Sequence, residues 1–302
     1  MSVSLYVRMS LLFFVLTGML MLLGYAVGLY FGNPLSFMLL GLVIAAVVNF
    51  VTYFWSDTIV IKMARARIIQ ESENPILYGT VRKVSQEAGI PMPRVGIVNQ
   101  AQPNAFATGR GPKKSVVVAT SGILNTLTPN ELEAVISHEI GHVVHRDILI
   151  SSVAATIAGV VSYLGNIALW SMWGGGGRGG RQGNGGVLTL VLASILVPLG
   201  ATFVRLGISR SFEMNADEYG ARLTRNPGAL ITALDKISVR ANTRRTAGSP
   251  GQSSTSASTA SLWIVNPFQG HSLVELFSTH PSTKKRVKRL REIADEIGVY
   301  VP

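Results

Sequence analysis

Cysteine is absent from all 302 residues of this chain. Its absence excludes a disulfide framework and any metal site that is built from thiolates. A metal ion bound by this protein would therefore have to use histidine, aspartate, glutamate or water as its ligands. A chain without cysteine is also compatible with a reducing cytoplasm.

Charged residues are scarce, at 14% of the chain, whereas apolar residues reach 48% and the mean hydropathy is +0.36. Four long apolar stretches carry no charge at all: residues 9–31, 34–55, 148–173 and 187–204. Each of the first two exceeds the ~20 residues that cross ~30 Å of hydrocarbon. The first is also too long for the core of a cleaved signal peptide, and the second follows almost at once. We therefore predict a membrane protein with about four transmembrane helices.

Acidic residues are few: the chain contains 16 aspartates and glutamates and 27 lysines and arginines, which gives a net charge of +11. In a soluble protein this excess would suggest nucleic acid. Here the basic residues flank apolar stretches, so we expect contact with anionic lipid headgroups and no nucleic-acid partner. Arg8 precedes the first stretch, and Lys62, Arg65 and Arg67 follow the second. By the positive-inside rule, the N-terminus and everything after residue 55 are predicted to be cytoplasmic.

The apolar stretches divide the chain into segments. A second hydrophobic hairpin with a glycine-rich linker (174–186) would return the chain to the cytoplasm, so the segments on either side of it can form one domain. Pro198 and Gly200 leave an incomplete crossing as the alternative. The predicted segments are an N-terminal transmembrane hairpin (1–58), the first part of a cytoplasmic domain (59–147), the second hairpin (148–208) and the second part of the domain (209–302).

The cytoplasmic segments are predicted to be α+β and mostly helical. Thr128 to Glu131 form a capping box with Pro129 at the first helical position, which predicts that a helix starts there. Other helices are expected at 75–88, 209–223, 227–240 and 281–297. Strands are expected at 94–98, 104–108 and 115–120. Residues 248–261 are expected to form a mobile Ser/Thr-rich loop.

The C-terminal helix is predicted to be amphipathic. Its apolar residues would dock on the domain and its basic face would be solvated; the alternative is that the basic face rests on anionic lipid. The basic residues are Lys284, Lys285, Arg286, Lys288, Arg289 and Arg291.

The most specific motif is His138-Glu139-Ile140-Gly141-His142, an H-E-x-x-H pattern. It lies about two turns inside the helix that starts near Pro129, and residues four apart share one face of a helix. Both imidazoles can therefore reach one metal ion, with Glu139 beside it to handle a proton. This geometry is typical of zinc-dependent peptide hydrolysis.

A catalytic zinc usually has three protein ligands and one open position. His145 lies about two turns beyond His138, which is too far along a straight helix for the two to share an ion. Glu213 is the best third ligand, because Glu213 and Asp217 are four apart and suit a ligand and a carboxylate that orients a ligand histidine. The alternative is a pair of solvated acids on a surface helix. The remaining histidines are His271 and His280.

The H-E-x-x-H helix, followed beyond a hydrophobic hairpin by Glu213-x-x-x-Asp217, resembles the M48 family of zinc metallopeptidases. The chain is similar to the HtpX branch of this family in three further features. These are the two leading spans, Asn-Ala-Phe-Ala at 104–107 and Thr-His-Pro-Ser at 279–282. The resemblance covers roughly residues 11–290. It implies a mostly helical, gluzincin-like zinc metallopeptidase domain with a small β-sheet, embedded in the cell membrane with its active site facing the cytoplasm.

The resemblance also implies the chemistry of the site. One zinc ion would be held by His138, His142 and Glu213, with Asp217 behind a ligand histidine and Glu139 as the catalytic proton carrier. His280, helped by Arg210, is the candidate donor to the developing oxyanion. The alternative for His280 is a structural role in the loop before the following proline.

For substrates, the resemblance implies misfolded or damaged membrane proteins that are degraded under stress. Asn104, Ala105, Phe106 and Ala107 are the candidate substrate-binding residues, because an unfolded chain can add to an exposed edge strand as a further strand. An ordinary internal strand is the alternative.

Three other functions remain open at this point. The first is a processing peptidase with one defined substrate, such as a prenylated peptide. The second is a zinc-binding membrane scaffold without catalytic activity. The third is a transporter. The first two spans contain no ionisable residue, which argues against a polar path through them.

Overall fold

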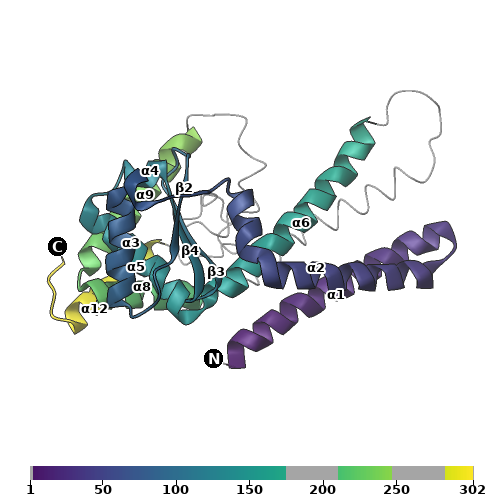
Figure 1. Ribbon diagram of the computed structural model, residues 1–302, viewed down its shortest axis with the longest axis horizontal. Helices are drawn as coiled ribbons and strands as arrows, with labels where there is room; N and C mark the ends of the chain where they lie inside the picture. Colours follow the sequence, from purple (N-terminus) through teal and green to yellow (C-terminus); the bar gives the residue numbers. More distant parts are fainter. Residues whose placement is uncertain (1–2, 175–209, 247–282, 302) are drawn as a thin grey trace. The chain divides into compact units, whose positions relative to one another are not determined.

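The computed structural model describes residues 3–174, 210–246 and 283–301 of the chain (Figure 1). The predicted span at 187–204 and the Ser/Thr-rich loop at 248–261 lie outside these residues, as does the glycine-rich linker after its first residue. The backbone divides into two compact units. One contains residues 1–56 and 153–207, and the other contains residues 57–152 and 208–302.

Two long helices form the first part of the chain, α1 (Val3–Phe31) and α2 (Pro34–Met63). A Cβ atom on Gly24 would lie 2.2 Å from the carbonyl oxygen of Phe37, and one on Gly41 would lie 2.3 Å from that of Leu20. Only glycine fits at these positions, so the two backbones touch, as they do where small residues line helix contacts in membranes. The two helices form an antiparallel hairpin (Figure 1).

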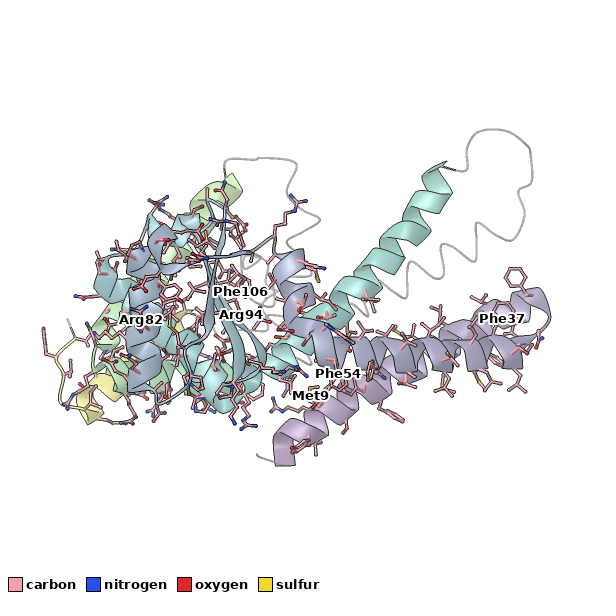
Figure 2. All side chains as sticks on the ribbon, in the orientation of Figure 1. Met9, Phe37, Phe54, Arg82, Arg94 and Phe106 are labelled. Atoms are coloured by element: carbon pink, nitrogen blue, oxygen red, sulfur yellow. The ribbon has the colours of Figure 1, made fainter. Side chains whose placement is uncertain are left out.

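Polar and aromatic contacts add to the hairpin. The side-chain amide of Asn49 donates a hydrogen bond to the Thr17 hydroxyl at 3.0 Å, which joins the two helices. Near the turn, the rings of Phe31 and Phe37 stack with centroids 5.5 Å apart. Phe37 lies at one end of α2 and Phe54 toward the other (Figure 2).

Two helices among the described residues are long and apolar enough to cross a membrane, Tyr6–Leu29 and Pro34–Met63. A third candidate exists only if α5 and the start of α6, which are bent by 91° at their junction, count as one span. The leading hairpin therefore agrees with the prediction, whereas the expected total of four transmembrane helices is not confirmed.

The second unit contains a four-stranded sheet in the order β1-β2-β4-β3. The central strands β2 (Arg94–Val98) and β4 (Lys114–Thr120) are parallel, while β1 (Arg67–Ile68) and β3 (Ala105–Gly111) pair antiparallel at the two ends. Val116, Val117 and Val118 of β4 are fully buried, as expected for a central strand with both faces covered.

Helices pack around this sheet. α3 (Pro75–Glu87) and α5 (Pro129–His145) contact the strands, and α5 also packs against α8 (Arg210–Thr224) and α9 (Pro227–Thr246). α12 (Thr283–Glu296) contacts α8 and α9. The apolar faces of these elements meet in one core, whose fully buried members include Leu77, Val135, Ile140, Leu234 and Ile293. α6 (Asp147–Gly174) follows α5 directly.

The predicted elements of this unit are present, with three short additions. Strand β1, the 3-10 turn at Glu71–Glu73 and helix α4 (Ser121–Leu124) were not predicted, since elements this short show no periodicity. The loop expected between β3 and β4 is shorter than predicted. Gly109 (φ 135°) and Gly111 (φ 132°) allow β3 to continue through a bulge to its turn.

The C-terminal helix docks on the domain through Leu290, Ile293 and Ala294, which are buried. One part of the prediction for this helix was wrong. Arg286 was assigned to the solvated basic face, but its side chain is 2% exposed. It lies four residues before Leu290 and seven before Ile293, so it shares their face of the helix.

Candidate metal centre

Helix α5 begins as the sequence predicts. The Thr128 hydroxyl accepts a hydrogen bond from the Glu131 N–H, and the Glu131 carboxylate accepts one from the Thr128 N–H, which completes the capping box. Pro129 occupies the first turn, where no N–H is needed. The helix ends at Arg146, whose φ of 64° is left-handed. The motif residues His138 and Glu139 lie in its buried interior.

Helix α8 approaches α5 unusually closely. A Cβ atom on Gly220 would lie 2.9 Å from the backbone nitrogen of His138, so α8 can hold only glycine there without moving. From the other side, a Cβ atom on Gly141 would lie 3.2 Å from the Cα atom of Ala216. This contact lets the short carboxylate side chains of α8 reach the imidazoles of α5.

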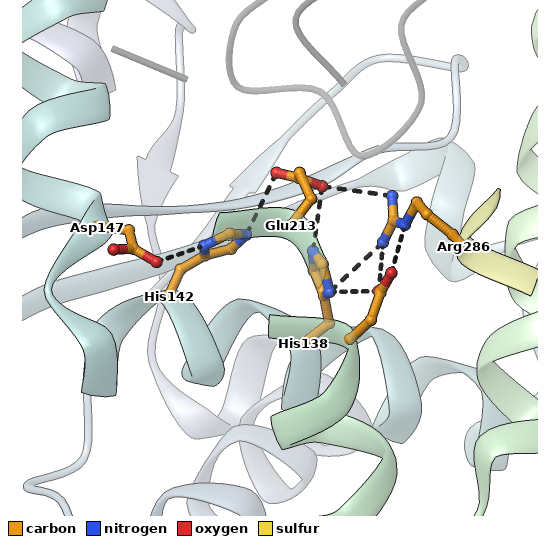
Figure 3. A network of polar contacts seen from close by, with 6 residues as sticks. His138, His142, Asp147, Glu213 and Arg286 are labelled. Atoms are coloured by element: carbon orange, nitrogen blue, oxygen red, sulfur yellow. Dashed lines mark hydrogen bonds and ion pairs between the residues drawn. The ribbon is translucent and has the colours of Figure 1, made fainter. Parts of the chain in front are cut away.

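Three side chains converge from these two helices (Figure 3). The Nε2 atom of His138 lies 3.7 Å from one carboxylate oxygen of Glu213, and the Nε2 atom of His142 lies 3.5 Å from the other. The two imidazole rings are nearly perpendicular, with centroids 4.8 Å apart. Within the described residues, these three form the one group of histidine and acidic side chains whose ligand atoms all lie within 4.8 Å of one another.

The far nitrogen of each imidazole faces a carboxylate. Nδ1 of His138 lies 2.9 Å from Asp217, and Nδ1 of His142 lies 3.5 Å from Asp147. An ionised carboxylate can only accept a hydrogen bond, so it holds the proton of a neutral imidazole on Nδ1. When both imidazoles are neutral, the lone pair of each Nε2 atom is turned toward Glu213, which is the arrangement of metal-binding histidines. This donor set therefore fits a divalent metal ion such as zinc.

Arg286 of α12 joins the same network. Its guanidinium donates two hydrogen bonds of 2.7 Å to the two oxygens of Asp217. It also lies 3.4 Å from Glu213 and 3.4 Å from Nδ1 of His138 (Figure 3). Three helices, α5, α8 and α12, thus contribute charged groups to one buried site.

Burial and charge shift the pKa values of this metal-free site. Burial would raise the pKa of Asp217, but Arg286 and His138 outweigh it and hold that pKa below its usual value. Burial lowers the pKa of His138, which keeps this imidazole neutral. Burial would also lower the pKa of His142, yet hydrogen bonds to Asp147 and Glu213 raise it to about 10. A metal ion therefore has to displace a proton from His142.

Glu139 is placed to exchange protons. Burial is the main reason why its pKa is raised to about 8. The negative charge of Glu213 also raises this pKa, whereas the positive charge of His142 lowers it. The nearby backbone N–H of Ala107 partly lowers this pKa. A carboxyl group that titrates near neutral pH can both take up and return a proton, as a general base and acid must.

Strand β3 brings the candidate substrate-binding residues beside Glu139. Within the described residues β3 pairs only with β4, so it is a terminal strand, although the side chains of Asn104 to Ala107 are buried. The Asn104 carbonyl accepts a hydrogen bond from the Thr120 N–H at 2.9 Å. Along an antiparallel strand, the backbone N–H and C=O groups of successive residues point alternately toward the partner strand and away from it. Ala105 and Ala107 therefore turn their backbone groups away from β4.

The other predicted residues lie in different places. His145 is not part of the ligand group, and its ring instead meets that of Tyr219 edge to face at 5.5 Å. Arg210 begins α8 three residues before Glu213, but its side chain is not among those described. His271 and His280 lie outside the described residues.

Asp147 and Arg286 belong to the site but were not predicted. Asp147 follows the left-handed residue that ends α5, so helical spacing does not place it beside His142. Arg286 was hidden in a run of basic residues. Helical spacing could have predicted its burial, because Arg286 shares a face of the helix with the apolar Leu290 and Ile293.

The geometry agrees with comparisons to known proteins. The family model described as Peptidase family M48 matches residues 71–294, a range that contains both imidazoles, Glu213 and Arg286. The chain belongs to peptidase family M48. This M48 chain is 46% identical over 300 residues to a protein of Pyrococcus furiosus named Protease HtpX homolog, covering 99% of each chain. A Thermococcus kodakarensis protein with the same name is 44% identical over 301 residues, covering 99% of this chain and 100% of the relative.

A solved structure is also similar to this M48 chain. The crystal structure of S. mikatae Ste24p aligns with 95% of this chain and 66% of its own length, at 16% identity and a TM-score of 0.46. A likeness of this size adds no argument beyond the family match. The M48 family and the names of the curated relatives, with the two apolar helices, support a membrane metalloprotease.

Proposed function

We propose that this protein is a zinc-dependent endopeptidase of the cell membrane that cleaves misfolded or damaged membrane proteins at the cytoplasmic side. One observation carries the catalytic part of the proposal. Two imidazoles turn their Nε2 atoms toward the Glu213 carboxylate, while a further carboxylate lies at the Nδ1 atom of each. Structural acids on a surface helix would not be buried in this way.

In this proposal His138, His142 and Glu213 hold the zinc ion. Bound there, zinc would supply Lewis acidity toward water and toward a peptide carbonyl. Glu139 takes up a proton from the attacking water and returns one to the leaving amine, for which its pKa of about 8 suits it. His280, helped by Arg210, stays our prediction for the donor that stabilises the oxyanion.

Substrate binding is assigned to the terminal strand. Ala105 and Ala107 direct their backbone groups away from β4, and the Ala107 N–H is near enough to the Glu139 carboxyl to lower its pKa. An extended substrate that adds beside this strand would bring its peptide bonds next to Glu139. Backbone pairing tolerates any side chains, which suits a protease for unfolded chains.

The membrane location supports the proposed substrates. Lys62 at the end of α2 and the nearby Arg65 and Arg67 favour a cytoplasmic position for the domain that follows. A protease joined directly to a membrane hairpin meets membrane proteins at a high effective concentration. We therefore assign its partners to damaged membrane proteins and the lipid bilayer.

The proposal is tested by comparing full-length wild type with Glu139→Gln and Glu213→Ala in detergent micelles. We expect the wild type to bind one zinc ion and to cleave casein. Glu139→Gln should keep its zinc and lose at least ~100-fold in cleavage, because only the proton carrier is removed. Glu213→Ala should lose both. Equal cleavage by wild type and Glu139→Gln would contradict the catalytic assignment.

A panel of unrelated unfolded membrane proteins tests the substrate class. Cleavage of most of them would support quality control, whereas a single cut in one partner would favour a processing peptidase. A scaffold without catalytic activity predicts that Glu139→Gln behaves in cells as the wild type does.

A further inference from the structure

Arg286 is the one buried side chain among the described lysines and arginines. Removing a guanidinium from water costs several kcal/mol unless strong partners replace the water. A residue that only completed the packing of α12 would be apolar, as Leu290 and Ile293 are on the same face. The charge at this position therefore needs a specific reason.

Its contacts supply that reason. The planar guanidinium forms a two-pronged contact with Asp217, with both hydrogen bonds at 2.7 Å. Its third nitrogen lies 3.4 Å from a carboxylate oxygen of Glu213. Glu213 and Asp217 are four residues apart on α8, so one arginine contacts both carboxylates of that helix at once.

We propose that Arg286 is a positioning residue of the metal centre, which fixes the Asp217 carboxylate against His138 and restrains Glu213 in its ligand orientation. The C-terminal helix α12 thereby completes a site whose ligands all come from α5 and α8. The inference rests on the proposed function only in requiring that the site binds zinc.

The shape of the guanidinium matters as much as its charge. A lysine ammonium is a single point of charge and cannot hold both oxygens of Asp217 in one plane. Lysine at this position should therefore keep α12 docked and still leave the carboxylates free to turn. Methionine would fill a similar volume and remove the contacts altogether.

The test measures Zn²⁺ affinity of the full-length chain by competition with a chromophoric chelator, which needs no peptide substrate. Arg286→Met should weaken Zn²⁺ binding by roughly 10- to 100-fold, the usual effect of removing a group that orients a metal ligand. Arg286→Lys should lose about 10-fold. Arg289 provides the matched control, because it lies on the same helix and pairs with Glu218 and Glu296 away from the site. Arg289→Met should stay within about twofold of wild type.

A readout of ligand geometry separates positioning from simple loss of structure. In the Co²⁺-loaded protein, the visible absorption bands of the ion report its ligand geometry. We expect them to shift in Arg286→Lys and to remain unchanged in Arg289→Lys, while the metal-free melting temperatures of both stay close to wild type. If Arg286→Met does not fold, the lysine variant alone decides the question.

A double-mutant cycle with Asp217→Asn adds an independent check. If Arg286 acts through Asp217, the double variant should bind Zn²⁺ about as well as the weaker single variant, and not worse by the product of the two losses. Wild-type affinity and an unchanged Co²⁺ spectrum in Arg286→Lys would overturn the inference. A wild type that binds no Zn²⁺ would instead overturn the proposed function itself.

Discussion

At the scale of single residues, the metal centre depends on what lies behind its ligands. Asp217 and Asp147 approach the far nitrogens of His138 and His142, and each keeps one imidazole turned toward Glu213. The two imidazoles nevertheless differ in charge, since burial lowers the pKa of His138 while carboxylates raise that of His142 to about 10. Metal binding must therefore compete with protons mainly at His142.

This competition predicts how pH changes metal binding. Below its pKa of about 10 the His142 imidazole carries a proton, which a metal ion has to displace. The affinity for Zn²⁺ should therefore fall by about tenfold for each unit by which the pH is lowered between 7.5 and 6. Chelator competition at several pH values measures this slope.

His145→Ala is the control for this experiment. Its ring packs on Tyr219 and is not in the ligand group, so the slope should not change. A Zn²⁺ affinity that is independent of pH in the wild type would show that His142 is neutral before the metal arrives.

At the scale of elements, the decisive feature is the close crossing of α5 and α8. Gly220 lies against the backbone of His138, and Gly141 lies against Ala216. Glutamate and aspartate side chains are short, so a wider crossing would move the carboxylates of α8 away from the imidazoles. The glycines thus allow the close approach that brings these carboxylates to the imidazoles.

Gly220→Ala should therefore be harmful in two ways. Its Cβ atom would lie 2.9 Å from the His138 nitrogen, a backbone atom that cannot move aside alone. We expect a loss of about 1–3 kcal/mol in stability, typical of overpacking, together with weaker Zn²⁺ binding. Thermal melting and chelator competition on the same samples measure both effects.

Gly79→Ala in helix α3 is the matched control. A Cβ atom there meets nothing within 4 Å, and alanine favours a helix interior by roughly 0.5–1 kcal/mol over glycine. This variant should be as stable as the wild type or more so, with unchanged metal affinity. If both glycine variants behave alike, close approach is not what selects Gly220.

Elements with a local signal could be predicted from the sequence, and contacts between distant elements could not. Helix α5 was predicted because its capping box, its apolar face and the H-E-x-x-H spacing all lie within one stretch of chain. The contact of Glu213 with that helix required the family resemblance, since spacing alone also allows a solvated pair of acids. Asp147 was missed because Arg146 turns the chain into a left-handed conformation just before it. Arg286 was missed because a basic run usually indicates a solvated face.

At the scale of the whole molecule, the metal centre joins segments that are far apart in the sequence. The histidines precede the segment predicted as the second hydrophobic hairpin (148–208), Glu213 and Asp217 follow it, and Arg286 comes about 70 residues later. Bound metal should therefore stabilise the second unit as a whole, because the ligands assemble only in the folded state.

Removal of the metal tests this coupling. At a free Zn²⁺ concentration about 1,000 times the dissociation constant, binding adds about 4.1 kcal/mol to the stability of the folded state. For a unit of this size, that amount corresponds to a change of roughly 10 °C in melting temperature. Melting of the metal-loaded and chelator-treated protein in the same detergent measures the difference.

Glu213→Ala should melt at the same temperature with and without added Zn²⁺, since it lacks one of the three ligands. A wild type whose melting temperature does not respond to metal would indicate that the site contributes nothing to the stability of the folded unit.

The wide separation of these residues along the chain has a consequence during synthesis. When the two histidines leave the ribosome, Glu213 and Arg286 have not yet been made, so the nascent protein holds an incomplete set of donors. The three ligands can meet only after α8 has emerged and packed against α5, and Arg286 can orient them only after α12 has followed. The order of the residues along the chain thereby delays metal binding until the residues on both sides of the second hydrophobic hairpin have been made.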